Sequence, residues 1–172
     1  YYYKPRVDKE ILRHYSGGLI ALSACLAGEV QKNLVRGLYE EAKQAAYEYQ
    51  DIFGKGNFFL ELQDHGISEQ QTANQGLLRL AKETGIELVA TNDCHYTYAE
   101  DEKPHDILLC LQTGKKLSDE NRMRYEGGQY YVKREDEMRG LFPYALQALE
   151  NTQKIADRCH VEIEFGVTKL PR

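Results

Sequence analysis

Short apolar runs alternate with longer stretches of helical periodicity along most of this chain. The runs at residues 19–22, 57–62 and 87–92 are rich in aliphatic, aromatic or β-branched side chains, which is typical of buried strands. Between and before these runs, apolar positions recur every three to four residues, which predicts amphipathic helices. We expect these helices at residues 7–15, 28–34, 38–53 and 68–84.

The alternation of strand and helix predicts an α/β fold with a parallel sheet, because parallel strands need a crossover connection. Three strands are too few to close a barrel, so we expect part of a β/α barrel or a small open sheet. The rest of the chain predicts a helical C-terminal extension. Its expected helices span residues 99–112, 134–141 and 143–158, with extended pieces at 129–132 and 161–165.

Length and cysteine usage narrow the class of protein. The 172 residues suit one domain, and neither a signal peptide nor an apolar run of membrane-spanning length is present. We therefore expect no membrane partner. The chain begins without Met and has no tail, so we expect it to be part of a longer protein. Four widely spaced cysteines without a C-x-x-C pair look like reduced thiols of a cytoplasmic protein: Cys25, Cys94, Cys110 and Cys159.

The charge balance argues against a stand-alone nucleic-acid binder. The net charge is −5, so no overall positive field attracts phosphate. One local basic segment contains Lys115, Lys116, Arg122 and Arg124, and it is either a solvated loop or a contact to a DNA backbone. Tyrosines at residues 130–131 either stack on bases or pack against a neighbouring segment.

The most informative chemistry lies at the end of the third predicted strand, in Asp93, Cys94 and His95. Side chains alternate along a strand, so Asp93 and His95 point the same way and Cys94 points the other way. A carboxylate and an imidazole on one face just past a strand are typical of the metal-binding or catalytic groups of α/β barrels, and both are good ligands for Zn, Mn or Fe. The alternative is a plain turn in which the aspartate bonds its own backbone.

Two other predicted strands carry polar groups to the same rim. Cys25 follows the first strand, and it is either a rim group or a small buried residue. His65 follows the second strand, where residues 64–66 form either a turn or a ligand-bearing loop. His105 near a helix start is most simply a surface or packing residue, and the alternative is a group that faces the same rim. The carboxyl ends of parallel strands share one edge, so Cys25, His65, Asp93 and His95 are expected near each other.

Several long segments resemble one protein family, the polymerase-and-histidinol-phosphatase (PHP) domain of bacterial replicative DNA polymerase III alpha subunits. The resemblance covers nearly the whole chain and is far more specific than the Asp-x-His triplet. The matching segments are residues 2–6, 18–29, 59–66, 89–96, 105–114 and 156–159.

The resemblance implies a distorted β/α barrel with a metal cluster at one end of its strands. Asp93 and His95 match the family's last metal-binding motif, and Cys25 matches a position where some members supply a ligand. It also implies that residues 1–112 are part of the barrel. Residues 113–172 are then the rest of the domain and an extension toward a polymerase palm and thumb.

The family's early histidine and acidic ligands and its palm carboxylates, which bind Mg, are absent from this chain. The resemblance therefore implies a fragment of a DNA polymerase that is inactive in polymerisation by itself. Its partners are expected to be DNA, deoxynucleotides and other polymerase III holoenzyme subunits. The domain is expected to act as a metal-dependent 3′–5′ exonuclease or as a structural support. The alternatives are a stand-alone metal-dependent phosphoesterase of the same superfamily and an inert scaffold.

Overall fold

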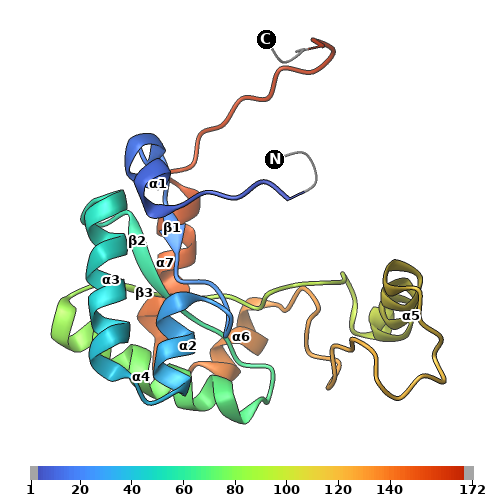
Figure 1. Cartoon of the computed structure of the whole chain (residues 1–172). Coiled ribbons are helices and arrows are strands. Elements are labelled where there is room, and N and C mark those ends of the chain that lie inside the picture. Colours follow the sequence, from blue (N-terminus) through green and yellow to red (C-terminus); the bar gives the residue numbers. More distant parts are fainter. Residues whose placement is uncertain (1–3, 169–172) are drawn as a thin grey trace.

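The computed structural model describes residues 4–168 as a parallel sheet with helices packed around it and one helix standing apart (Figure 1). Most predicted elements are present, with ends that differ by one or two residues. The elements in chain order are α1 (Lys9–Tyr15), β1 (Ala21–Leu22), α2 (Glu29–Val35), α3 (Tyr39–Phe53), β2 (Phe58–Leu62), α4 (Ser68–Thr84), β3 (Leu88–Ala90), the 3₁₀ helix η1 (Ala99–Asp101), α5 (Glu102–Thr113), α6 (Glu135–Leu141) and α7 (Leu146–Ala156).

The sheet has the strand order β1-β2-β3, and both pairings are parallel. Ala21 pairs with Phe58 across the first interface, and Leu60 pairs with Leu88 across the second. Helices α2 and α3 connect the first two strands, and α4 connects the last two, as expected for crossover connections. The predicted α/β class and parallel sheet are confirmed, while the prediction that this sheet is part of a β/α barrel with a helical C-terminal extension stays a prediction.

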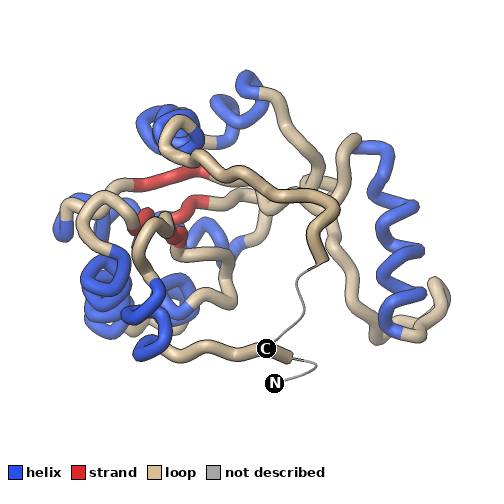
Figure 2. Tube along the Cα trace, turned by 90° about the horizontal axis from the view of Figure 1, so that it is seen from above, coloured by secondary structure: helices blue, strands red, loops and turns tan. Residues whose placement is uncertain are grey.

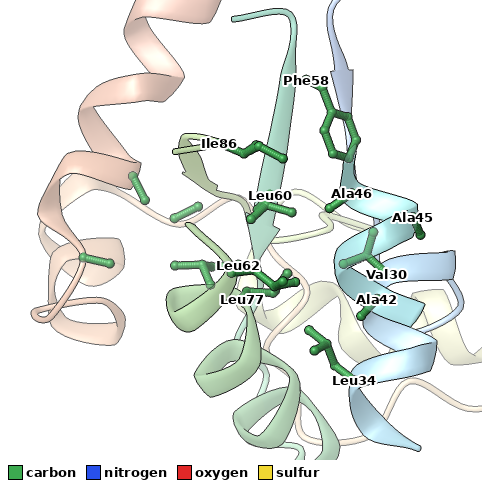
Figure 3. Close-up of a cluster of buried hydrophobic side chains, with 14 of the residues drawn as sticks. Val30, Leu34, Ala42, Ala45, Ala46, Phe58, Leu60, Leu62, Leu77 and Ile86 are labelled. Atoms are coloured by element: carbon green, nitrogen blue, oxygen red, sulfur yellow. The ribbon is translucent and has the colours of Figure 1, made fainter. Parts of the chain in front are cut away.

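The main hydrophobic core lies between β2 and the helices that cover it (Figure 3). Phe58, Leu60 and Leu62 alternate along β2 and all belong to this core. Three alanines on α3 present a small apolar face, which allows that helix to approach the sheet closely. All five residues of β2 are buried, so both faces of the central strand are covered. The core members from the helices are Val30, Leu34, Ala42, Ala45, Ala46, Leu77, Leu80 and Ala148, and Ala145 joins them from the turn before α7.

Helix α7 closes the side of the sheet at β3. The side-chain amide of Asn151, which is almost fully buried, donates to the Leu88 carbonyl at 2.8 Å. The predicted start of this helix at residue 143 is wrong, because α7 begins at Leu146. Residues 142–145 instead form a turn in which the Ala145 amide bonds the Phe142 carbonyl and the Phe142 ring is fully buried.

Helix α5 stands away from the sheet and its helices in both views (Figures 1 and 2). The predicted single helix from residue 99 is divided here into η1 and α5. The segment that returns from α5 pairs with the segment that leads to it through an isolated bridge between Tyr96 and Tyr131.

The predicted extended piece at 161–165 has neither helix nor strand. The predicted domain boundary after residue 112 falls at the end of α5 and stays a prediction.

No helix within residues 4–168 combines the length and the hydrophobicity that crossing a membrane requires.

Candidate metal site at the carboxyl edge of the sheet

Asp93 and His95 lie side by side just beyond β3. The Oδ1 atom of Asp93 is 3.5 Å from Nε2 of His95, and both side chains are partly exposed. The Cys94 thiol points elsewhere and donates to the Tyr131 carbonyl at 3.4 Å. The sequence-based prediction that the carboxylate and imidazole share one side, with the thiol on the other, agrees with this arrangement.

The geometry that brings the pair together is a turn and not a strand. β3 ends at Ala90, whereas the predicted strand continued to residue 92. Asp93 has a φ of 42°, which lies in the left-handed region that few residues other than glycine adopt. The chain therefore turns sharply at Asp93, and His95 is held after the turn because its amide donates to the Tyr130 carbonyl at 2.8 Å.

The spacing of the two donor atoms fits part of a divalent-metal site. Two ligands about 2.1 Å from one tetrahedral ion are roughly 3.4 Å apart, and the observed separation is 3.5 Å. Carboxylate oxygen and imidazole nitrogen together suit Zn, Mn and Fe. Within residues 4–168, however, no three His, Cys, Asp or Glu side chains gather as a group that could hold a metal.

Cys25 is half-buried in the loop after β1, on the same edge of the sheet. Burial first, then the Asp93 carboxylate, and more weakly Tyr125, Tyr96 and Cys25 raise the pKa of the Tyr130 hydroxyl. Cys25 does not form a three-ligand group with Asp93 and His95 in the described part of the chain. Its role as a ligand stays a prediction.

His65 reaches the same edge but uses both of its ring nitrogens within the protein. Nε2 lies 2.8 Å from the Asn92 carbonyl oxygen, and Nδ1 lies 2.8 Å from the side-chain nitrogen of Gln70. The turn alternative for residues 64–66 is confirmed, since the Gly66 amide donates to the Asp64 carboxylate at 2.9 Å and Gly66 has a φ of 80°. Burial lowers the pKa of His65, which favours the neutral imidazole.

A cluster of aromatic rings surrounds His95. The His95 ring centroid is 4.2 Å from Tyr125 and 5.7 Å from each of His105 and Tyr130. His105 thus faces the candidate site, although the sequence favoured a surface or packing role. Tyr125 was not singled out at all, because nothing in its local sequence shows that the segment after α5 returns to β3.

A buried polar network lies under this edge of the sheet. The Glu61 carboxylate accepts bonds from the Thr91 hydroxyl at 2.5 Å and the Ala24 amide at 2.9 Å. The Gln31 amide donates to the Ser23 hydroxyl at 2.6 Å. These bonds connect the ends of all three strands, so they hold the loops that carry the candidate ligands. The sequence carries one signal of this network, because Glu61 is a charged residue within the otherwise apolar strand β2.

The basic segment after α5 is only partly available to a ligand. Arg122 forms a two-pronged ion pair with Asp106 of α5, and its side chain is 4% exposed. This ion pair holds the loop against the helix and lowers the pKa of the Asp106 carboxyl. Lys115, Lys116 and Arg124 are exposed, and their contact with DNA stays a prediction.

Comparison with protein families gives one match. Residues 1–65 match the PHP domain family, and this match ends before Asp93 and His95.

Comparison with curated proteins extends the similarity to nearly the whole chain. The chain is 45% identical over 170 residues to the DNA polymerase III subunit alpha of Treponema pallidum, an alignment that covers 99% of the chain. It is 47% identical over 158 residues to that of Saccharopolyspora erythraea, covering 91% of the chain, and 40% identical over 178 residues to that of Thermus aquaticus, covering 100%. The chain spans only 13–14% of the length of these relatives.

Proposed function

We propose that this chain contributes ligands to a divalent-metal site at which phosphodiesters are hydrolysed. The chain belongs to the DNA polymerase III alpha subunit family and carries part of its PHP domain. The reaction we favour is 3′–5′ exonuclease cleavage of DNA. The observation that carries the proposal is the 3.5 Å approach of Asp93 Oδ1 and His95 Nε2 at the carboxyl edge of a parallel sheet.

The chemistry follows from this donor pair. A divalent metal bound there would supply hydroxide from water and would neutralise charge on the scissile phosphate. The Asp93 carboxylate and the His95 imidazole would hold the ion, and Cys25 is the further ligand that we propose. The rings of His105, Tyr125 and Tyr130 limit how the His95 imidazole turns.

The activity of the whole protein is a proposal of its own, because the chain spans only 13–14% of its relatives. We propose that the intact polypeptide is a DNA-directed DNA polymerase acting with DNA, deoxynucleotides and Mg within a multi-subunit replicase. The similarity over 99% of the chain to a polymerase subunit supports this proposal over a stand-alone phosphoesterase.

The first experiment measures metal in a full-length subunit that carries this sequence. Wild type, Asp93→Asn, His95→Ala and the control His14→Ala are purified identically and analysed by plasma mass spectrometry for Zn, Mn and Fe. His14 is an exposed histidine on α1. We expect bound metal in wild type and the control, and less in both ligand variants. Exonuclease activity and melting temperature should fall in parallel, because a ligand that binds only the folded state stabilises it.

Two results would contradict the proposal. If all four proteins contain the same amount of metal, Asp93 and His95 are not metal ligands. Absence of metal in wild type after loading with Zn, Mn or Fe would leave the domain as a structural support for the polymerase.

A further inference from the structure

His65 is built into the candidate site in a way that excludes it as a ligand. Its side chain is 5% exposed, and its backbone amide donates to Oε1 of Gln70 at 2.7 Å. That bond fixes the orientation of the Gln70 amide, so the nitrogen of Gln70 is the atom that donates to Nδ1. The Asn92 carbonyl accepts only, so Nε2 of His65 carries the proton and donates to it. No lone pair of the ring remains for a metal.

The bond from Nε2 acts on one particular peptide group. The Asn92 carbonyl belongs to the peptide that joins Asn92 to Asp93, and the φ angle of Asp93 is the rotation next to this peptide. That angle is 42°, an uncommon value for a residue with a side chain, so the surroundings must hold it. The His65 bond at 2.8 Å holds this peptide plane from the β2 side.

The same residue also supports His95 through a ring contact. The His65 ring stacks on Tyr130 with centroids 3.9 Å apart and an angle of 16° between the planes. Tyr130 in turn meets His95 edge-on at 5.7 Å, and its carbonyl accepts the His95 amide proton. One buried imidazole therefore restrains the backbone before Asp93 and the ring next to His95.

We propose that His65 is a positioning residue that holds the Asn92–Asp93 peptide in the orientation that places the Asp93 carboxylate beside His95. The inference rests on the proposed function for its metal readout, but its structural readout is independent of metal. Two substitutions separate the roles. His65→Phe keeps a stacking ring and loses both hydrogen bonds, whereas His65→Gln keeps an amide donor near the position of Nε2.

The first test is hydrogen exchange by mass spectrometry on a full-length, metal-free subunit that carries this sequence. In His65→Phe we expect faster exchange in the peptide covering residues 91–96, where the His95 amide is bonded. We expect wild-type exchange there in His65→Gln and in the control His14→Gln. Unchanged exchange of residues 91–96 in His65→Phe would overturn the inference, whether or not the protein binds metal.

The second test is the dissociation constant for Mn²⁺ of the same four proteins by calorimetric titration. A positioning role predicts a constant about 10–100-fold higher in His65→Phe and a value near wild type in His65→Gln, as for other groups that orient metal ligands. Loss in both variants would indicate a ligand and overturn the inference. Wild-type affinity for Mn²⁺ in His65→Phe would show that His65 contributes only to packing, and it would overturn the inference. If wild type binds no Mn²⁺, the proposed function fails and the exchange comparison alone decides the role of His65.

Discussion

At the residue scale, Gln31 is the group on which the polar network under the candidate site depends. Its side chain is 3% exposed, and its amide nitrogen donates to the Ser23 hydroxyl, the Ala24 carbonyl and the Glu61 carbonyl at 2.6, 2.7 and 3.3 Å. The acceptors lie on the loop after β1 and on β2, so one side chain joins two strand ends. Buried acceptors that lose their donor cannot turn to water.

We therefore expect Gln31→Leu to lower the free energy of unfolding by about 1–3 kcal/mol, the usual cost of leaving buried polar groups unpaired. Urea denaturation followed by circular dichroism measures this difference. The control is Gln71→Leu, which makes the same change at an exposed position on α4. A loss no larger in Gln31→Leu than in the control would mean that the network does not stabilise the fold.

Residues that lie close together in the chain were predictable as neighbours in the site, whereas contacts between distant segments were not. The pairing of Asp93 with His95 was predictable because the two residues are two positions apart and follow an apolar run. The proximity of Tyr125 to His95 was not predictable, because it depends on the return of a segment thirty residues later in the chain. His65 was found as a rim residue, but its bonds to Gln70 and Asn92 depend on tertiary packing.

At the element scale, a charged cluster ties α3 to α4 on the molecular surface. The Glu83 carboxylate accepts from Lys43 of α3 at 2.7 Å and from Arg79 of its own helix at 2.8 Å. The Arg79 guanidinium also lies over the Tyr39 ring at 3.8 Å. The hydrogen bonds from Lys43 and then Arg79 lower the pKa of Glu83 to about 2 from the usual value of 4.5.

A lowered carboxylate pKa fixes the direction of the pH dependence. The stabilisation is complete above the unfolded-state pKa near 4.5 and is lost as the pH falls toward 2. We expect Glu83→Gln to be less stable than wild type at pH 7 in urea denaturation, and the difference to shrink steadily between pH 4.5 and pH 2. The exposed Glu126→Gln serves as the control and should track wild type. If the difference in stability between Glu83→Gln and wild type does not change with pH, the ionised Glu83 carboxylate is not the cause of that difference.

Element boundaries show where sequence periodicity is informative and where it is not. Helix α3 was predicted within one residue, because its alanine stripe and the glycine that follows it are local signals. The start of α7 was misplaced, because Pro143 suits the first turn of a helix as well as a tight turn. The burial of Phe142 decides between them, and burial depends on the core that the whole fold creates.

At the scale of the whole molecule, the two edges of the sheet differ. The outer edge of β3 is covered by α7, where Asn151 bonds the Leu88 carbonyl. The strand order places β1 at the other edge, and within residues 4–168 no strand pairs with its outer side. Leu19 and Leu22 next to this edge are 50% and 39% exposed. An open edge with apolar side chains is a template for pairing with another strand.

We expect the chain by itself to self-associate through β1, and Leu22→Lys to reduce this association, because a charge on an edge strand opposes pairing. Sedimentation velocity over a range of protein concentrations measures it, with circular dichroism to establish that each protein is folded. Tyr47→Lys is the matched control, since it removes an equally exposed apolar side chain from α3. Wild type that stays monomeric at every concentration would show that the β1 edge does not pair. An equal reduction by both substitutions would attribute association to general surface hydrophobicity, whereas a reduction by Leu22→Lys alone would identify β1 as the edge that pairs.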